Sequence, residues 1–485
     1  MYLSKLQLHN FMSYSGRDPY EFEFGPACNY LVGNNNCGKS TIFFALELLS
    51  NKGAKIPSYA PVRCTASEGY VGAIFSAGSA GDFSPQLKKY VYQDSAGHFT
   101  VQVKRGFKLS GGNATAEKPV AFDNITGKFD NVVPDAEIDG LVSPTCIDAL
   151  IEPGDFADFG FTKLLGKILG MQSASIDALA LWKEYQDAHE RLTTDPSGIP
   201  SALESIQKDL NDSLASLLDG VTARFVFSPQ EVRDFLKSGT VFVDDGNQET
   251  ELGSKGSGLQ KAFAIAVIQA YAKHVAKHAS SKLDLCIDEP ETWLHPAAQI
   301  QFGEAISKIA ASQQVWIATH SPYIIQSYSA TRDDRLLIFS EQNAAPRYKL
   351  ADKLNPHTGK RPSLAQISYE AFGLYTPEYH CELLGYIQVK SKKKSLKDLE
   401  EYLTKLASSL GGIAKRTRCK VDGGGKACES EELLPFYIRN CIHHPEAAGK
   451  ITKEMRQKNI DNEFTQEELG ESIRFLSKLI SANRW

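Results

Sequence analysis

The 485-residue sequence lacks any apolar run close to the roughly 20 residues that a helix needs to cross a bilayer. Its opening, MYLSKLQLHNF, lacks the unbroken apolar segment of a secretory signal. The nine cysteines form no Cys-x-x-Cys pair, which is typical of reduced thiols. A net charge of -5 excludes an overall basic chain that coats nucleic acid. These absences predict a cytoplasmic protein with no membrane partner.

The composition is that of an ordinary folded protein, with 42% hydrophobic and 23% charged residues. The length indicates roughly two to four domains. The alternating opening residues predict a strand, and short β-prone segments from about 69 to 129 predict an antiparallel hairpin lobe. Residues 175–218 predict two helices, broken at Pro196-Ser197-Gly198-Ile199-Pro200 and paired as a helical hairpin.

Strands and helices alternate further along the chain. Strands are expected at 223–227, 239–243, 283–287, 313–319 and 335–339, and helices after Leu259 and after Pro296. Such alternation is typical of a parallel sheet. The predicted fold class is therefore α/β, an ATPase head with a mixed or parallel sheet, a β-hairpin lobe, a short helical-hairpin insertion and an all-α C-terminal region. The predicted segments are 1–165, 166–222, 223–345 and 346–485.

The strongest motif is a phosphate-binding loop, GNNNCGKS, between a short apolar strand and a helical pattern. Its glycines let successive backbone N–H groups face a phosphate at a helix N-terminus. We expect Lys39 to reach the β- and γ-phosphates of ATP and the Ser40 hydroxyl to hold Mg²⁺. The predicted nucleotide-binding residues of this loop are Gly33, Asn34, Asn35, Asn36, Cys37, Gly38, Lys39, Ser40 and Thr41.

A second motif, LDLCIDEPE, is a buried strand that ends in carboxylates. Ligands bind at the carboxyl ends of parallel strands, so Asp288 is placed to orient Mg²⁺. Glu289, the next residue, is placed to polarise the water that attacks the γ-phosphate. His320 follows another apolar strand and is placed to contact the same phosphate. Taken alone, a histidine at such a position is more often structural.

A third motif, KGSGLQ, opens a helix upstream of the acidic strand. Its serine and glycine amides are suited to a second anion-binding turn. The residues expected to bind nucleotide here are Ser257, Gly258 and Gln260.

These motifs, in this order and followed by ATHSP, resemble the ATP-binding-cassette ATPases of the RecF and OLD group, relatives of the chromosome-organising ATPases. The resemblance covers most of residues 1–345. It implies a head-to-tail homodimer with two ATP molecules, in which Lys39, Glu289 and His320 of one subunit face Ser257 of the other. The leucine and second glycine of the family's Leu-Ser-Gly-Gly-Gln signature are not kept. The region around Ile151-Glu152-Pro153 is the candidate for the family's glutamine loop.

The C-terminal region carries a basic run, which fits a solvated helix edge or a contact with nucleic acid or an acidic partner. Arg439 and His444 resemble the Arg-x4-His motif of HEPN-type ribonuclease domains. Such a pair could stabilise a phosphorane and move the 2′-OH proton. The alternative is that both residues hold a helical bundle together or bind a partner.

A compact cassette ATPase with a helical tail resembles the AriA-type ATPase subunits of PARIS antiphage systems and the PtuA-type subunits of Septu and retron systems. OLD nucleases carry a Toprim nuclease domain, but after His320 we find no glutamate followed by an Asp-x-Asp pair. The leading hypothesis is an oligomeric ATPase that senses a phage protein or nucleic acid and controls a separately encoded effector nuclease. The alternatives are an ATP-gated ribonuclease, similar to the anticodon-nuclease ATPases PrrC and RloC, and a RecF-like DNA-repair ATPase.

Overall fold

The structure is a computed structural model. It describes residues 1–50, 68–110, 113–147, 153–161, 163–218, 220–227, 230–277, 284–342, 345–354, 357, 362–407, 412–421, 427–444 and 462–482. Contacts between Cα atoms divide the chain into two units, the first formed by 1–146, 284–291 and 296–485 and the second by 147–283 and 292–295. Among the described helices, none is long and apolar enough to span a membrane.

An antiparallel sheet opens the first unit. Its strand order is β2-β1-β4-β6-β8-β9, and β5 and β7 also pair with β6. The predicted opening strand and hairpin lobe are therefore confirmed. The strands are β1 Tyr2–His9, β2 Tyr20–Glu23, β4 Glu68–Ala77, β5 Tyr92–Gln93, β6 Phe99–Ser110, β7 Asn113–Ala116, β8 Val120–Asp123 and β9 Lys128–Val132.

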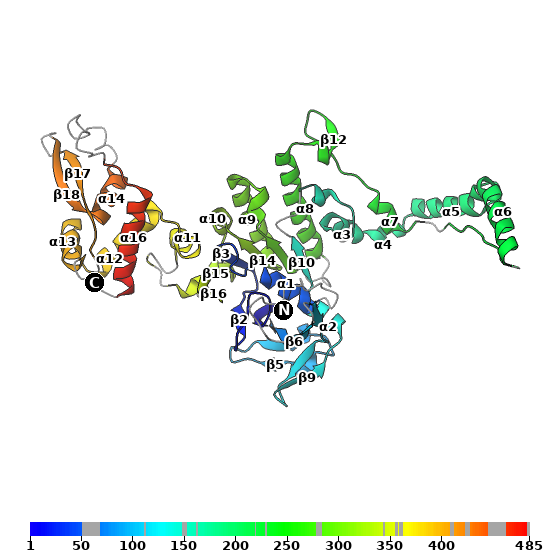
Figure 1. The fold of residues 1–485 in the computed structure, drawn as a ribbon, viewed down its shortest axis with the longest axis horizontal. Helices are drawn as coiled ribbons and strands as arrows, with labels where there is room; N and C mark the ends of the chain where they lie inside the picture. Colours follow the sequence, from blue (N-terminus) through cyan, green and yellow to red (C-terminus); the bar gives the residue numbers. More distant parts are fainter. Residues whose placement is uncertain are drawn as a thin grey trace. The chain divides into compact units, whose positions relative to one another are not determined.

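The second sheet of this unit has the order β10-β13-β14-β3-β15-β16. Strands β13, β14, β3 and β15 pair in parallel, and β16 closes the edge antiparallel to β15. Figure 1 shows β3, β14 and β15 side by side although they lie far apart in the sequence. The predicted parallel sheet is confirmed, and it continues beyond residue 345. Its strands are β3 Cys28–Gly33, β10 Pro144–Ile147, β13 Asp284–Asp288, β14 Gln314–Thr319, β15 Arg335–Gln342 and β16 Ala345–Leu350.

One hydrophobic core joins these two sheets through helix α1, Thr41–Ser50. The core contains Leu46 of α1 together with Leu6 and Val71 of the antiparallel sheet and Trp316 of the parallel sheet. Burying these side chains is the main force that holds the phosphate loop, which enters α1, between the sheets. Other helices of this part are α2 Asp135–Leu141, α9 Pro296–Ala310, α10 Pro322–Ile325 and α11 Leu364–Phe372.

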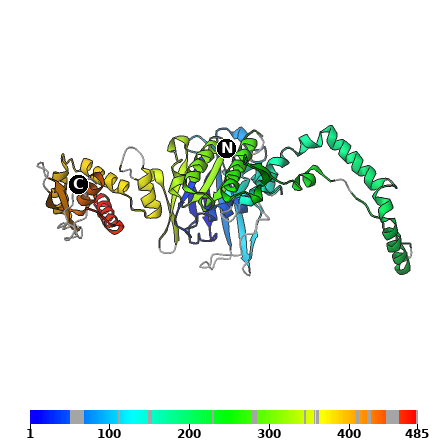
Figure 2. The same ribbon diagram turned by 90° about the horizontal axis from the view of Figure 1, so that it is seen from above.

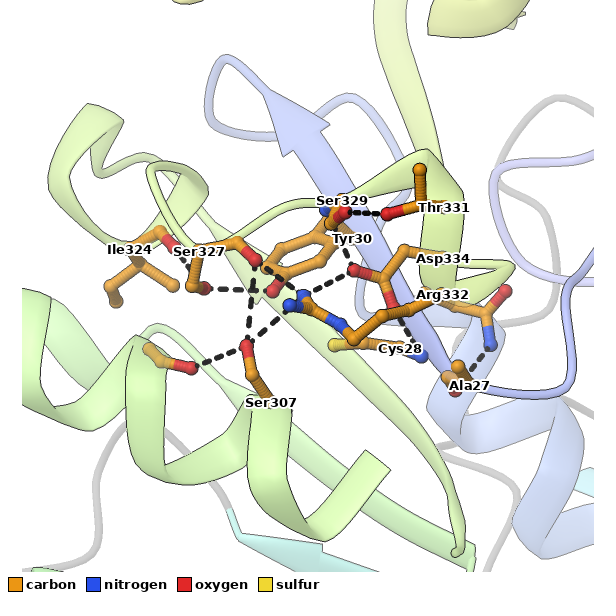
Figure 3. A network of polar contacts seen from close by, with 12 residues as sticks. Ala27, Cys28, Tyr30, Ser307, Ile324, Ser327, Ser329, Thr331, Arg332 and Asp334 are labelled. Atoms are coloured by element: carbon orange, nitrogen blue, oxygen red, sulfur yellow. Dashed lines mark hydrogen bonds and ion pairs between the residues drawn. The ribbon is translucent and has the colours of Figure 1, made fainter. Parts of the chain in front are cut away.

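A buried polar network fixes the start of β3, at the end opposite the phosphate loop (Figure 3). Asp334 is fully buried and accepts hydrogen bonds from the backbone of Cys28 and Ser329. The Arg332 guanidinium donates to Asp334 Oδ2 at 2.6 Å, and it also donates to the Ser307 hydroxyl of α9. A buried carboxylate needs such partners, so this network ties the connection between β14 and β15 to β3.

The second unit is largely helical. Both helices predicted for 175–218 form, as α5 Ala180–Thr194 and α6 Ile199–Leu217. Figures 1 and 2 draw α6 continuing from α5 at an angle, so the pair is not the side-by-side hairpin that we expected. The remaining elements are α3 Leu164–Gly170, α4 Ser173–Asp177, α7 Val232–Lys237, β11 Phe242–Asp244, β12 Glu249–Glu251 and α8 Ser257–Lys277.

The strand predicted at 223–227 does not form. This segment is irregular and bonds to polar side chains of α6 instead of to another strand. Asn211 accepts a hydrogen bond from the backbone N–H of Ala223 at 2.6 Å and donates to its carbonyl oxygen at 3.2 Å. These side-chain bonds replace the ladder that a strand would need.

The C-terminal residues form their own hydrophobic core. Here the prediction of an all-α region is wrong, because a two-stranded antiparallel hairpin lies among the helices. Asn462 bonds to both the N–H and the C=O of Cys419, each at 2.9 Å, and so holds the first strand in place. The elements are α12 Pro377–Lys390, α13 Leu396–Ala407, β17 Lys415–Val421, β18 Ala427–Leu433, α14 Leu434–His443 and α16 Gln466–Ser481.

Candidate nucleotide-binding site

Three neighbouring parallel strands bring the predicted site residues to one edge of the sheet. Asp288 of β13 is in register with Ala318 of β14, and Thr319 is in register with Val32 of β3. The phosphate loop, the acidic pair and His320 therefore follow adjacent strand ends. This is the edge where parallel sheets bind ligands.

The phosphate loop has a backbone that demands glycine at two positions. Gly33 has φ +145° and Gly38 has φ +90°, and Asn36 also adopts a positive φ, +60°. A Cβ on Gly38 would lie 2.5 Å from the hydroxyl oxygen of Tyr14, which donates to the Gly38 carbonyl at 2.9 Å. Any side chain at 38 would therefore collide with the residue that supports the loop.

The loop residues differ in exposure. Asn34, Asn35 and Asn36 are exposed, whereas Cys37 is 3% exposed and donates to the Asn34 carbonyl. Burial raises the pKa of the Cys37 thiol, against the opposing effect of the Lys39 charge. The thiol therefore packs inside the loop and leaves the outer edge to backbone amides and asparagine side chains. Ser40 immediately precedes α1, which begins at Thr41, and the Thr41 hydroxyl lies 3.5 Å from that of Ser13.

Lys39 is 4% exposed and its ammonium group is surrounded by acceptors. Its Nζ donates to the carbonyl oxygens of Gly33 at 3.1 Å and Asn34 at 2.9 Å, and lies 3.0 Å from His320 Nε2. Burial lowers the pKa of Lys39, whereas the carboxylates of the acidic motif raise it. A cation held at the mouth of the loop is suited to an anionic ligand.

Glu289 and His320 meet beside Lys39. His320 Nε2 is 3.1 Å from Glu289 Oε1, and Glu289 holds its place with a positive φ of +44° and an N–H bond to the Ala318 carbonyl. Burial and the Lys39 charge lower the pKa of His320, while Glu289 raises it. One ring nitrogen serves either as an acceptor for Lys39 or as a donor to Glu289, so the two contacts are alternatives.

The signature turn lies in the second unit, at the start of α8. Ser257 and Gly258 are exposed, and Gln260 donates to the Lys255 carbonyl at 2.8 Å. Lys255 in turn pairs with Asp245 of the β11–β12 loop at 3.0 Å. This pairing lowers the pKa of Asp245 to about 2. The N-terminus of a 21-residue helix is thus presented on a turn that a hairpin supports.

The C-terminal pair is not brought together. Among the described contacts, Arg439 donates to the Asn440 side chain at 3.0 Å, and His444 is an exposed residue that directly follows α14. The neighbouring His443 instead lies near a thiol, with its Nε2 atom 3.7 Å from Cys381 Sγ. Within the described residues, no group of three His, Cys, Asp or Glu side chains is arranged to hold a metal. Of the proposed glutamine-loop region, Ile151 and Glu152 lie outside the described residues.

Sequence reasoning missed Glu291, whose carboxylate accepts from Thr319 Oγ1 at 2.8 Å and from the His320 backbone N–H. Burial raises its pKa. The signal was present in the motif, since Glu291 is the second carboxylate after the strand that ends in Asp288. Its partners, about 30 residues further on, are visible only in the fold.

Two family models match this chain. One, described as an AAA domain, covers residues 5–125, and the other, described as an AAA ATPase domain, covers 163–325. The chain therefore contains AAA-type ATPase sequence in two stretches, and the second stretch includes the predicted helical insertion at 166–222.

A curated relative is the Old nuclease of Escherichia phage P2, which is 25% identical over 323 residues. The match covers 62% of this chain and 54% of the relative, so it spans about half of that protein's length.

Similar solved structures include the SMC head domain from Thermotoga maritima, with 15% identity and a TM-score of 0.35, and the Pyrococcus furiosus Smc head bound to the C-terminal domain of ScpA, with 17% identity and a TM-score of 0.42. Each covers 72% of this chain, and the matches span 98% and 96% of those chains. Because both TM-scores are below 0.5, the fold assignment rests on the strand order described above.

Proposed function

We propose that this chain binds and hydrolyses ATP at the edge formed by β3, β13 and β14. The observation that carries this proposal is the contact of Lys39, His320 and Glu289, which three separate parts of the chain bring to one point. The two matching ATPase-domain models support it.

The residues at this edge fit Mg²⁺ and a triphosphate. Ser40 and Asp288 offer the oxygen ligands that a hard cation prefers, and both follow strands that end at the same edge. Bound Mg²⁺ would supply charge that neutralises the phosphate oxygens. Lys39 and the amides of the phosphate loop bind the same oxygens, while Glu289 orients the attacking water and accepts its proton. His320 lies beside the place where the charge of the γ-phosphate develops.

Hydrolysis in this proposal requires two copies of the chain. In this proposal, Ser257, Gly258 and Gln260 of one subunit bind the nucleotide of the other, as the resemblance to RecF and OLD ATPases implies. Support comes from the exposure of Ser257 and Gly258 at the start of a long helix, where backbone N–H groups are available to an anion. Head-to-tail dimers would then be the catalytic unit, within a higher homo-oligomer.

The biological role that we propose is that of a sensor and scaffold in antiphage defence. In this role a phage protein or nucleic acid triggers the ATPase, which holds or releases a separately encoded effector nuclease. The similarity to a phage-encoded Old nuclease over its matched half supports this role over a housekeeping one. The HEPN-like alternative gains no support from the separate contacts of Arg439 and His444.

The test is ATP turnover by the purified chain with and without Mg²⁺, in parallel with light scattering to follow the oligomer. We expect Mg²⁺-dependent hydrolysis whose specific rate rises with protein concentration, because the active unit is a dimer. A Ser257→Arg variant should lose both turnover and ATP-dependent association. Turnover by a monomer, or no response to ATP and Mg²⁺, contradicts the proposal. DNA-stimulated turnover that falls steeply with salt favours the repair alternative.

A further inference from the structure

Glu291 lies three residues beyond Asp288, in the short helical turn Pro290–Trp293 that follows β13. Both of its carboxylate oxygens accept hydrogen bonds from residues at the end of β14. Oε1 accepts from the backbone N–H of His320, and Oε2 accepts from the hydroxyl of Thr319, which is fully buried. Glu291 therefore bonds directly to the residue whose side chain lies between Lys39 and Glu289.

These bonds are part of a closed ring. The Thr319 hydroxyl also accepts from the backbone N–H of Ser321 at 2.9 Å. The Ser321 hydroxyl donates to Gln299 Oε1 at 2.5 Å, and Gln299 Nε2 approaches the Glu291 carbonyl at 3.5 Å. His320 is the residue between two members of this ring, so its backbone is fixed on both sides.

The ring also connects to the local helices. The Ser321 hydroxyl caps α10 by accepting from the N–H groups of Tyr323 and Ile324. Gln299 is a buried residue of α9. The turn that carries His320 is thus tied to β13, α9 and α10 together, and a shift of the turn would break several buried hydrogen bonds.

We infer that Glu291 is a positioning residue for ATP hydrolysis, one that holds His320 at the point where its ring meets both Lys39 and Glu289. This inference rests on the proposed function, and it adds how His320 of the proposed ATPase site is held in place. Among the described contacts, Glu291 makes no hydrogen bond or ion pair to Lys39 or to the phosphate loop, and its charge is one of several that raise the pKa of Lys39. Its direct bonds run to the Thr319 hydroxyl and to the main chain of His320, so it positions His320 through the main chain. Its loss should slow the chemical step and leave nucleotide affinity in place.

The first experiment compares Glu291→Ala, Glu291→Gln and the control Glu304→Ala, an exposed glutamate of α9. We expect Glu291→Ala to lower kcat about 10- to 100-fold, because small misplacements of a catalytic group cost rates of this order. KM for ATP should stay within about threefold. Glu291→Gln should recover at least about fivefold of the lost kcat, since its amide oxygen still accepts the His320 N–H. Equal losses of affinity and rate, or no recovery by glutamine, overturn the inference.

A double variant separates positioning from direct action. If Glu291 acts through His320, then Glu291→Ala combined with His320→Ala should be no slower than His320→Ala alone, within about twofold. Multiplying losses would show an independent role and overturn the inference.

A measurement that does not depend on ATP hydrolysis tests this inference separately from the proposed function. In histidine-labelled protein, the ring signal of His320, identified by its absence in His320→Ala, should move in Glu291→Ala and stay in place in Glu304→Ala. An unmoved signal overturns the positioning role even in an active enzyme. If the wild-type chain lacks ATP turnover, the proposed function fails, and the signal alone decides whether Glu291 positions His320.

Discussion

The nucleotide edge and helix α14 pair a basic residue with a histidine in opposite ways. Lys39 and His320 are 281 positions apart, yet their nitrogen atoms lie 3.0 Å from each other. Arg439 and His444 belong to one short stretch, yet Arg439 bonds to its neighbour Asn440 and the histidine is exposed. Neighbouring parallel strands end at one edge of the sheet, whereas residues five apart along a helix point in different directions and His444 lies just past the end of α14.

This difference teaches that closeness in a motif does not establish closeness in a site. At the nucleotide edge, each residue is held by backbone geometry that a different chain segment supplies. At α14, the arginine already has a local partner, and the adjacent histidine, His443, lies beside Cys381. A catalytic role therefore has firmer physical support at the first place than at the second.

The largest effect that would test this comparison is expected from Lys39→Ala. Removing the buried cation leaves the phosphate oxygens without their principal partner, so ATP hydrolysis should fall about 1,000-fold and tight ATP binding should be lost. Fluorescent-nucleotide titration and phosphate release measure the two losses. The matched control is Lys349→Ala, a surface lysine of β16. Equal losses in both variants would break the comparison.

Glu289→Gln should lower turnover about 100-fold while ATP stays bound, because the amide no longer accepts a proton from water. ATP should then trap the head-to-tail dimer, which light scattering after gel filtration detects. Glu304→Gln serves as the charge-matched control. If Glu289→Gln hydrolyses ATP at the wild-type rate, Glu289 is not the group that accepts the proton of the attacking water.

A third prediction concerns the buried histidine of the C-terminal core. His380, fully buried in the C-terminal core, bonds to Ser472 at 3.0 Å, and burial lowers its pKa to about 4. The unfolded chain binds this proton below about pH 6.5 and the folded chain does not, so stability is full above that pH. It should fall by about 3 kcal/mol as the pH drops from 6.5 to 4.

Pulse proteolysis in urea, followed through peptides of α12 and α16, measures this change. His380→Gln, which keeps a donor for Ser472 but does not titrate, should flatten the pH dependence. His98→Gln, at an exposed histidine, should not. An unchanged slope in His380→Gln would show that other groups control the stability of this region.

The smallest effect is expected at α14. His444→Ala and Arg439→Ala should leave ATP turnover within about twofold, and the wild-type chain should not cut tRNA in the presence of ATP. Gel analysis of the RNA beside the phosphate-release assay checks both statements. RNA cleavage that disappears in His444→Ala would reverse the comparison and favour the ribonuclease alternative.

The parts of the fold that rest on local pattern could be predicted from the sequence. The apolar strand before the phosphate loop and the strand before Asp288 form where their patterns predict them. The hairpin β17–β18 could not, because its sequence is rich in Lys, Arg and Glu, which have low strand propensity. It is stabilised by distant partners, such as Glu468 of α16 for Arg416 and Asn462 for Cys419.

In the candidate site too, the features that depend on local pattern could be predicted and those that depend on long-range contacts could not. The phosphate loop could be predicted from the fixed spacing of its glycines and lysine, because these residues act within one turn of the chain. The ring around Glu291 depends on Thr319, Ser321 and Gln299, which only the pairing of β13 with β14 and the packing of α9 bring to it. No periodicity of the sequence encodes such a ring.

The support of Gly38 by Tyr14 has a consequence for how this loop can be inherited. The tyrosine belongs to the turn after β1, and its hydroxyl fills the space that any larger residue at 38 would need. A phosphate loop inherited from another gene would therefore lack the tyrosine that supports it, unless the segment around residue 14 were inherited together with the loop. Exchange between related genes should therefore preserve or replace the two stretches jointly.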